Sequence, residues 1–347
     1  MSPVALERVA LKSLMLLPRP VLSRLAAGVE TRGRDHLDPH MRFLLALSSA
    51  KPTLNSASVP EARKLYQDMI ALMDVAEQSL PVVVDHQVPV EGDASILVRR
   101  YRPENAPRLA PAILFFHGGG FTVGGVEEYD RLCRYIAVHT NAVVLSVDYR
   151  LAPEHPSPTG ANDGLAAWRW LLDNTAALGL DPDRLAVMGD SAGGNLSAVV
   201  SQQARLAGLP VPALQVLIYP TTDAELKHPS VQSLGQGFGL DLPLLTWFRS
   251  HFITDPAMME DYRLSPLRNP DLADLPPAIL VTATDPLRDE GLEYGDKLRR
   301  AGVDVTSLDY PQLVHGFITM GGVIPAARKA VDAICDATAR QLKASRV

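Results

Sequence analysis

The centre of the sequence reads Gly189-Asp190-Ser191-Ala192-Gly193-Gly194. Residues 184–188 before it form a short apolar stretch of strand type, and residues 195–200 after it indicate the start of a buried helix. A Gly-x-Ser-x-Gly motif between a strand and a helix is the context that a nucleophile elbow requires, because the turn is so sharp that small residues must flank the serine. A glycine-rich turn without chemistry would show the same motif, so other residues must distinguish the two.

Composition excludes several classes of protein. The 347 residues suffice for one large α/β domain with an insertion or for two domains. The formal net charge of −6 argues against a nucleic-acid or anionic-membrane partner, because an acidic surface is repelled by phosphates. Cys133 and Cys335 lie in separate apolar, helix-like stretches, so we expect two buried free thiols. The nine histidines are scattered without metal-ligand spacing, which disfavours a metal hydrolase.

The N-terminal region shows no targeting signal. The apolar stretch 14–17 is not followed by a cleavage site of small residues, and no stretch approaches the ~20 apolar residues that a membrane span needs. We therefore expect a cytoplasmic protein without an integral membrane segment. A membrane-surface helix is the alternative for residues 1–27, and the few basic residues on its polar face disfavour it.

The hydrophobic pattern changes along the chain. Apolar residues recur at helical spacing through residues 1–80, so we expect helices there that cover another part of the fold. Residues 82–84 and 96–98 flank a turn and predict an antiparallel pair of strands. Strands and helices then alternate, which predicts a mostly parallel sheet with helices on both faces. Residues 222–265 interrupt this alternation and predict an inserted helical segment that forms a lid with the N-terminal helices.

The alternating part has well-marked elements. The expected strands are continuous apolar stretches, at residues 112–116, 142–147, 184–188, 214–218, 278–281 and 304–308. The expected helices lie between or after them, at residues 129–139, 163–174, 192–207, 292–301 and 326–342. Each crossover between parallel strands is expected to be right-handed.

A glycine-rich loop follows the strand at 112–116. Its sequence is His117-Gly118-Gly119-Gly120-Phe121. Consecutive glycines let backbone amides approach a ligand oxygen, and in an acyl-transfer enzyme such amides would stabilise an oxyanion together with the amide after the serine. A phosphate-binding loop is the alternative, but no Lys-Ser/Thr pair and no Gly-x-Gly-x-x-Gly spacing is present.

An acid and a base follow later strands. The chain order Ser191, Asp285, His315 is that of the α/β hydrolases. In such a triad the serine attacks, the histidine accepts its proton, and the aspartate fixes the tautomer of the imidazole. Asp289 and Glu290 are alternative acids, and we choose Asp285 because it is the first acid after the strand.

Together these motifs resemble the bacterial hormone-sensitive-lipase family of carboxylesterases. The resemblance rests on His117-Gly-Gly-Gly, Gly189-Asp-Ser-Ala-Gly-Gly, Asp285-Pro-Leu-Arg-Asp-Glu-Gly and His315-Gly-Phe, with Tyr149-Arg-Leu-Ala-Pro-Glu-His-Pro similar to a further block. It covers residues 80–345. It implies an α/β-hydrolase fold with a mostly parallel sheet of about eight strands, helices on both faces and a helical cap. The corresponding segments are an N-terminal cap at 1–80, a core at 81–221 and 266–347, and an inserted cap at 222–265.

The resemblance also implies roles for individual residues. Ser191, Asp285 and His315 would form the catalytic triad, and the amides of Gly119, Gly120 and Ala192 would form the oxyanion hole. His117 would brace the glycine loop by hydrogen bonding, and Asp190 and Glu290 would support the site as neighbouring acids. One block departs from the family, since residues 157–160 read Ser-Pro-Thr-Gly where Phe-Pro-Ala-Ala is usual, which makes this loop more polar.

The implied function is a serine carboxylesterase. It would hydrolyse short- to medium-chain acyl esters of small molecules through an acyl-serine intermediate, without a metal or cofactor. A deacetylase, lactonase or amidase would use the same triad, and a non-catalytic ligand-binding member is disfavoured because the histidine is present. Candidate acyl-pocket residues are Phe121, Phe238, Trp247 and Phe317, although core packing explains Phe238 and Trp247 equally well. A homodimer through an edge strand is common in the family, but the sequence indicates no interface.

Overall fold

The computed structural model describes residues 3–27, 34–49 and 51–344. Within these residues the strands form one sheet of eight, in the order β1-β2-β4-β3-β5-β6-β7-β8. The strands are β1 (Val82–Val90), β2 (Ala94–Arg102), β3 (Ala110–Phe116), β4 (Val143–Asp148), β5 (Leu180–Asp190), β6 (Leu214–Ile218), β7 (Ala278–Thr284) and β8 (Val305–Val314). The predicted mostly parallel sheet of about eight strands is therefore confirmed.

The first two strands form the predicted antiparallel hairpin. β1 pairs with β2 around a turn in which Gly92 and Asp93 have φ angles of 85° and 54°. Glycine adopts this left-handed conformation freely, and aspartate is one of the few other residues that tolerate it. β2 also pairs antiparallel with β4, and the neighbours from β4 to β8 pair parallel.

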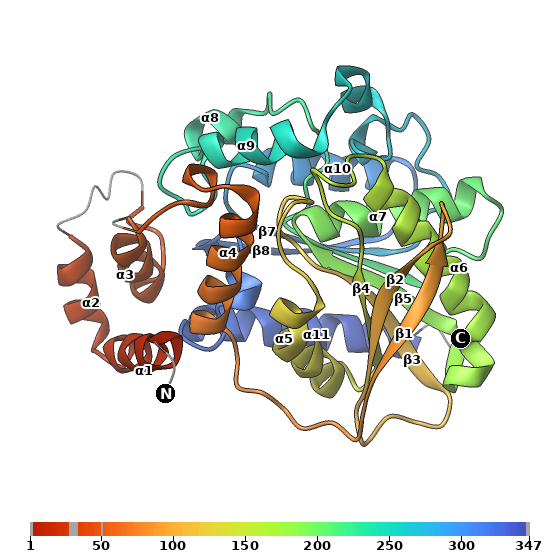
Figure 1. Cartoon of the computed structure of the whole chain (residues 1–347), viewed down its shortest axis with the longest axis horizontal. Coiled ribbons are helices and arrows are strands. Elements are labelled where there is room, and N and C mark those ends of the chain that lie inside the picture. The colour runs from red at the N-terminus through yellow and green to blue at the C-terminus, as the bar shows by residue number, and fades with distance from the viewer. Residues whose placement is uncertain (1–2, 28–33, 50, 345–347) are drawn as a thin grey trace.

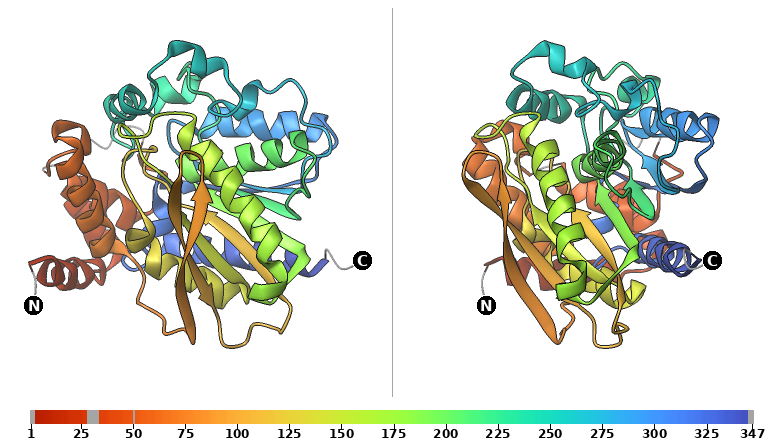
Figure 2. Two further views of the ribbon diagram at one scale, coloured as in Figure 1. Left: turned by 45° about the vertical axis from the view of Figure 1, so that its right-hand side comes forward. Right: turned by 90° about the vertical axis from the view of Figure 1, so that its right-hand side faces the viewer.

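Helices cover both faces of this sheet (Figure 1, Figure 2). One face is covered by α5 (Val126–Thr140) and α11 (Pro325–Ala344), and the other by α6 (Thr159–Leu178), α7 (Ala192–Leu206) and α10 (Arg288–Arg300). Successive side chains of a strand point to opposite faces, so Phe115 packs with the first set of helices and Phe116 with the second. Burial on both faces explains why the central strands are continuously apolar.

The N-terminal region and the insertion are helical where the structure describes them, as the sequence predicts. Their helices are α1 (Pro3–Met15), α2 (Arg19–Ala26), α3 (Pro39–Ser48), η1 (Leu54–Ser56), α4 (Val59–Met73), α8 (Pro229–Ser233), α9 (Leu242–Phe252) and η2 (Pro256–Glu260). The two regions meet in one apolar cluster, where Ala62 of α4 and Phe248 of α9 pack with Val123. Residues 1–2, 28–33 and 50 of the predicted N-terminal cap lie outside the described residues. The division into cap and core stays a prediction.

The strands that carry the candidate site residues are longer than the sequence predicts. β7 continues past residue 281 to Thr284, and β8 continues past residue 308 to Val314. β8 is an edge strand whose residues alternate in burial, so its second half lacks the continuous apolar pattern of a central strand. As a result Asp285 and His315 directly follow the carboxyl ends of parallel strands, where α/β proteins place their ligands.

Candidate active site

Ser191 lies on a strained turn between β5 and α7. Its φ and ψ angles are 56° and −116°, a conformation that residues other than glycine rarely adopt. A Cβ atom on Gly189 would lie 2.3 Å from the carbonyl oxygen of Gly193, and one on Gly193 would lie 1.9 Å from that of Phe116. The turn therefore closes only with glycine at both positions. The N–H of Ser191 donates to the carbonyl of Ile218 at 2.9 Å, which ties the turn to β6.

His315 bridges the serine and an aspartate. Its Nε2 atom lies 2.9 Å from Oγ of Ser191, and its Nδ1 atom lies 3.3 Å from Oδ2 of Asp285. A carboxylate oxygen only accepts hydrogen bonds, so Nδ1 carries the ring proton and the bare Nε2 accepts the serine hydroxyl. The imidazole also packs on Tyr219, with ring centroids 4.6 Å apart. This arrangement can take a proton from Ser191 and return it to a leaving group.

Asp285 is well placed to orient the histidine. Its side chain is fully buried, and its Oδ1 accepts the N–H of Leu287 at 2.7 Å. The alternative acids point elsewhere: Asp289 accepts the N–H of Ser230 at 2.8 Å, and Glu290 accepts backbone N–H groups of the loop after β6. The geometry therefore favours the choice of Asp285.

The glycine loop leaves its backbone donors free. Gly119 and Gly120 have φ angles of 115° and 56°, and a Cβ on Gly120 would lie 2.3 Å from the ring of Phe248. Among the described residues, no acceptor takes a hydrogen bond from the N–H groups of Gly119, Gly120 or Ala192. Three unpaired donors that flank the serine turn are what an oxyanion hole requires.

Asp190 links the serine turn to the glycine loop. Its Oδ1 accepts the N–H of Gly118 at 2.8 Å, and its Oδ2 accepts the hydroxyl of Tyr129 at 3.2 Å and that of Tyr219 at 3.4 Å. Burial raises the pKa of Asp190 to about 6, although the nearby His315 and these hydrogen bonds act in the opposite direction. The carboxylate thus holds the two halves of the site together.

His117 stiffens the start of the same loop. Its Nδ1–H donates to the carbonyl of Gly118 at 2.7 Å, and its ring stacks on Tyr149 with centroids 4.3 Å apart. The hydroxyl of Tyr149 donates to the carbonyl of His117 at 2.8 Å. Burial lowers the pKa of His117, so the neutral tautomer with a proton on Nδ1 is favoured.

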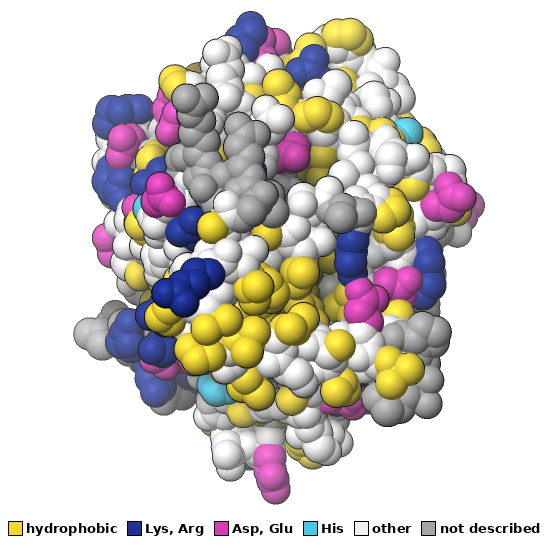
Figure 3. Space-filling model, turned by 90° about the vertical axis from the view of Figure 1, so that its left-hand side faces the viewer, with side chains coloured by type: hydrophobic (Ala, Val, Ile, Leu, Met, Phe, Trp, Pro, Cys, Tyr) yellow, Lys and Arg dark blue, Asp and Glu magenta, His cyan; other side chains and the backbone are white. Residues whose placement is uncertain are grey.

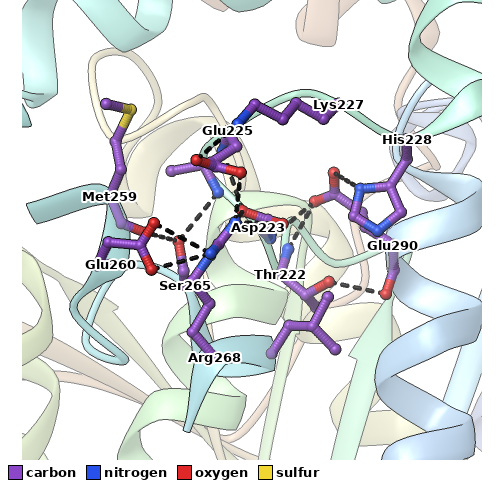
Figure 4. A network of polar contacts seen from close by, with 12 residues as sticks. Thr222, Asp223, Glu225, Lys227, His228, Met259, Glu260, Ser265, Arg268 and Glu290 are labelled. Carbon is purple, nitrogen blue, oxygen red and sulfur yellow. Dashed lines mark hydrogen bonds and ion pairs between the residues drawn. The ribbon is translucent and has the colours of Figure 1, made fainter.

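Glu290 supports the loop after β6 (Figure 4). Its Oε1 accepts the N–H of Thr222 at 2.7 Å and that of Asp223 at 3.2 Å. The preceding residue, Thr221, donates its N–H to the carbonyl of Ser191 at 3.4 Å. Burial raises the pKa of Glu290 to about 8, and the nearby Asp223 acts in the same direction. Oε2 of Glu290 has no hydrogen-bond partner among the described residues and lies 4.0 Å from Nδ1 of His228. Glu290 therefore acts on the serine turn through a loop and not through the histidine.

Arg268 neutralises a cluster of acids that is seen in the same view (Figure 4). Its guanidinium forms ion pairs with Asp223, Glu225 and Glu260, at distances of 3.1, 2.6 and 2.9 Å. The three carboxylates neutralise the guanidinium. Arg268 therefore ties the start of the insertion, at Asp223 and Glu225, to its end, at Glu260.

Sequence reasoning missed several residues that connect these parts. The hydroxyl of Tyr66 on α4 lies 2.9 Å from that of Tyr129 on α5, which in turn contacts Asp190. Phe248 covers Gly120, as described above. These side chains come from helices whose sequence carries no motif, so no local signal could identify them. Tyr149 is the exception, because it begins the further family block.

The four candidate pocket residues lie in different surroundings. Phe121 is half-buried and lines a small cavity beside α7. The centroid of its ring lies 4.8 Å from that of Phe252. Phe238 is buried in the main core, and Trp247 is half-buried against Phe248. Phe317 is fully buried and packs in the core near Tyr219 and Tyr310. The structure brings only Phe121 to the wall of this cavity.

Other expectations concern ions, thiols and membranes. Cys133 and Cys335 are free and buried, and burial raises the pKa of both thiols, as expected for structural cysteines. Within the described residues, no cluster of three or more His, Cys, Asp or Glu side chains is suited to hold a metal ion. The described helices include none that is long and apolar enough to cross a membrane.

Comparisons with known proteins identify the family and the fold of the chain. A family model described as the alpha/beta hydrolase fold matches residues 113–319. Ethyl acetate hydrolase of Pseudomonas putida is 38% identical, and the match covers 83% of this chain and 92% of that protein. Carboxylesterase NlhH of Mycobacterium tuberculosis is 39% identical, with 86% and 94% covered. A solved ester hydrolase from the metagenome of Lake Arreo, complexed with a bipyridine phosphonate derivative, is 38% identical over 88% of this chain and 98% of that chain, with a TM-score of 0.84.

Proposed function

This chain belongs to the alpha/beta hydrolase family of carboxylic ester hydrolases, and we propose that Ser191, His315 and Asp285 carry out its reaction through an acyl-serine intermediate. The resemblance to the bacterial hormone-sensitive-lipase carboxylesterases is confirmed by these relatives. Carboxylesterase activity on esters is thereby assigned to the chain. The roles of individual residues, the acyl length and the cap are the proposed parts.

Acylation begins at Ser191. Its Oγ attacks the ester carbonyl carbon while the hydroxyl proton passes to Nε2 of His315, and Asp285 keeps Nδ1–H oriented and stabilises the imidazolium. The carbonyl oxygen becomes an oxyanion that accepts the free N–H groups of Gly119, Gly120 and Ala192. Each such donor is worth about 2.7–4 kcal/mol of transition-state stabilisation.

The reaction is completed in two steps, which are collapse of the tetrahedral intermediate and hydrolysis of the acyl-serine. The bond to the alkoxide breaks as His315 donates its proton to the leaving oxygen, which releases the alcohol and leaves Ser191 acylated. A water molecule next gives a proton to His315 and attacks the acyl carbon, and the second collapse returns the proton to Ser191 and releases the carboxylic acid. The reaction consumes one water and needs no electron transfer.

A single observation supports this proposal most strongly. His315 lies within hydrogen-bond range of Ser191 on one side and Asp285 on the other, at 2.9 and 3.3 Å. A ligand-binding member of the fold would not need a base in contact with the serine. The hydrogen-bond contacts of both ring nitrogens therefore favour a catalytic role over ligand binding alone.

We further propose that residues 1–80 and 222–265 form a cap that selects small esters with short to medium acyl chains. Support comes from the apolar cluster in which α4 and α9 meet over the glycine loop. The cytoplasmic location and the edge-strand homodimer stay predictions.

The test is hydrolysis of a series of p-nitrophenyl esters of increasing acyl length. Ser191→Ala is expected to lower kcat by about 10⁴-fold or more, since a triad without its nucleophile keeps only the oxyanion hole and binding. Circular dichroism and the melting temperature should match the wild type. Ser233→Ala, which changes an exposed serine of α8, serves as the matched control and should keep full activity. Full activity of Ser191→Ala would contradict the assignment.

A further inference from the structure

Helix α1 presents apolar side chains to solvent. Leu6, Val9 and Leu14 are 58%, 54% and 39% exposed, and their spacing places them on one side of the helix. Leu16, just after the helix, is 86% exposed. A surface helix ordinarily turns its apolar side to the core, so the outward apolar side of α1 needs an explanation.

The exposure does not come from a loosely attached helix. On the inner side of α1, Met15 is buried, and Val4 and Leu11 pack against the main core. The guanidinium of Arg8 donates to the backbone carbonyls of Asp74 and Val75, at 2.8 and 3.2 Å. The inner side is therefore fixed, and the outer apolar side is held in place.

The apolar surface continues onto α2. Val21 and Leu25 are 36% and 53% exposed and lie one turn apart, while Leu22 and Ala26 on the adjoining side of the helix are buried. Figure 3 shows hydrophobic side chains gathered on this side of the molecule, with Lys and Arg and also Asp and Glu side chains around them. We call the exposed side chains Leu6, Val9, Leu14, Leu16, Val21 and Leu25 the α1–α2 face.

Positive charge gathers around the α1–α2 face although the whole chain has a net charge of −6. The charged residues between positions 3 and 27 are Arg8, Lys12, Arg19, Arg24 and a lone acid, Glu7. Two of these charges are balanced nearby, because Arg19 pairs with Asp38 and Glu7 pairs with Lys51. Arg24 forms no hydrogen bond or ion pair through its side chain with the residues that the structure describes.

Cations from other helices add to this group. Arg131 of α5 and Arg328 of α11 lie close enough to Lys12 that, with burial and Arg8, they lower its pKa. Neither Lys12 nor Arg131 has a hydrogen-bond or ion-pair partner within the described part of the chain. Asp74 is an acid that faces this group, and the four cations Arg8, Lys12, Arg131 and Arg328 outnumber it. The excess of positive charge favours an anionic ligand. The sequence alone disfavoured a membrane helix because α1 itself has few basic residues, and the fold supplies the missing ones.

We propose that the α1–α2 face docks on a lipid bilayer that contains anionic lipids, with both helices lying along the membrane surface. The exposed leucines and valines would enter the boundary between headgroups and acyl chains, and the neighbouring cations would contact lipid phosphates. Apolar side chains alone would fit another protein equally well. The cations around the face distinguish the bilayer, because an anionic surface neutralises them wherever they lie. Arg24 and Lys12 have no ion-pair partner among the described residues.

A second copy of the chain is the main alternative occupant. In a symmetric dimer the same face meets itself, so Arg24 and the group around Lys12 would approach the identical cations of the other copy. Of the acids near the face, Glu7 and Asp38 are already paired, and Asp74 is buried beside Arg8 and Arg131. Repulsion therefore disfavours the dimer and favours the bilayer.

Vesicle co-sedimentation of the full chain tests the proposal. The protein is mixed with vesicles of phosphatidylcholine alone or with about 30 mol % phosphatidylglycerol, in low salt and in about 0.5 M NaCl. Binding to the anionic vesicles is expected to be at least about tenfold tighter than to the neutral ones and to weaken in high salt. Leu6→Ser/Leu16→Ser is expected to bind at least about tenfold more weakly, and Arg24→Gln about fivefold.

Matched measurements separate docking from misfolding. Leu206→Ser changes a leucine of α7 that is 56% exposed and lies outside the α1–α2 face, so it should bind like the wild type. All variants should keep the melting temperature and the rate with a soluble ester. Absence of vesicle binding, equal binding to neutral vesicles, or equal loss in Leu206→Ser would overturn the proposal. So would a wild-type dimer in sedimentation equilibrium that Leu6→Ser/Leu16→Ser converts to a monomer.

Discussion

The carboxylate of Asp190 accepts a hydrogen bond from the N–H of Gly118 at 2.8 Å. This bond joins the turn that carries Ser191 to the loop that carries two of the three oxyanion donors. Tyr129 extends the connection, since its hydroxyl contacts both Asp190 and the hydroxyl of Tyr66 on α4. The nucleophile, the oxyanion hole and an N-terminal helix therefore share one buried polar network.

The charge of Asp190 should matter for turnover. Asp190→Asn keeps an acceptor for Gly118 but removes a negative charge near His315, which attracts the positive charge that develops on the imidazole during catalysis. We expect kcat to fall by about tenfold above pH 7, which corresponds to about 1.4 kcal/mol. Because the pKa of Asp190 is about 6, the wild-type carboxylate takes up a proton below that pH and the two proteins should converge there. A pH profile of kcat for both proteins checks this, and a rate ratio that stays constant with pH would count against it.

The serine turn should not tolerate a methyl group at position 193. A Cβ on Gly193 would lie 1.9 Å from a backbone oxygen, so Gly193→Ala is expected to lower the free energy of unfolding by about 3 kcal/mol or more and to abolish activity. Gly291→Ala is the control, because a Cβ there meets no atom closer than 3.8 Å and alanine favours the helix. Urea unfolding of both variants gives the comparison. Equal stability of the two would show that the turn can relax.

Glu290 should make stability depend on pH. Its pKa is about 8 in the folded chain and near 4.5 when exposed, so between these values only the unfolded state is ionised and stability falls as pH rises. Between pH 6 and 8 we expect ionisation of this residue in the unfolded state to lower the free energy of unfolding by about 1.4 kcal/mol for each pH unit. Glu290→Gln should lose that slope while keeping the acceptor for Thr222.

Urea unfolding at pH 6, 7 and 8 measures this slope for the wild type and for Glu290→Gln. The exposed Glu104→Gln is the control and should follow the wild type. If Glu290→Gln retained the wild-type slope, the burial of this carboxyl would not be the source of the pH dependence.

Phe248 is expected to position the oxyanion loop. Its ring lies where a Cβ on Gly120 would be, and its side chain is 7% exposed. Phe248→Ala would open space over the loop and should lower kcat by about tenfold to 100-fold, less than the loss of a whole oxyanion donor. Phe248→Leu should restore most of the rate. Steady-state kinetics decide the point, because a rise in KM with unchanged kcat would indicate a substrate contact instead.

Much of the candidate site could be predicted because its residues lie in short contiguous sequence motifs. The glycines that flank Ser191 predict the sharp turn at the serine, and the three consecutive glycines predict a loop with exposed backbone amides. The alternation of apolar strands with helices also predicts the sheet. The sequence identifies His315 by its order after Ser191 and Asp285, but its pattern ends the preceding strand early. The edge position of β8 explains the extension of that strand to Val314.

The parts that could not be predicted depend on contacts between distant segments. Tyr66 and Tyr129 are 63 residues apart, and no spacing in the sequence pairs their hydroxyls. Trp247 is a predicted pocket residue, but its neighbour Phe248 is the one whose ring covers Gly120. Only the orientation of the helix distinguishes the two. Phe317 belongs to a family motif, but packing against Tyr219 places it in the core.

Covalent labelling by a p-nitrophenyl phosphonate ester tests the proposed role of Ser191 most directly. Attack by Oγ would form a serine–phosphorus bond and release one p-nitrophenolate for each active molecule, while esterase activity falls in proportion. Peptide mass spectrometry is predicted to find the adduct on Ser191, and His315→Ala should label far more slowly. An adduct on another residue, or continued ester hydrolysis after complete labelling of Ser191, would contradict the account.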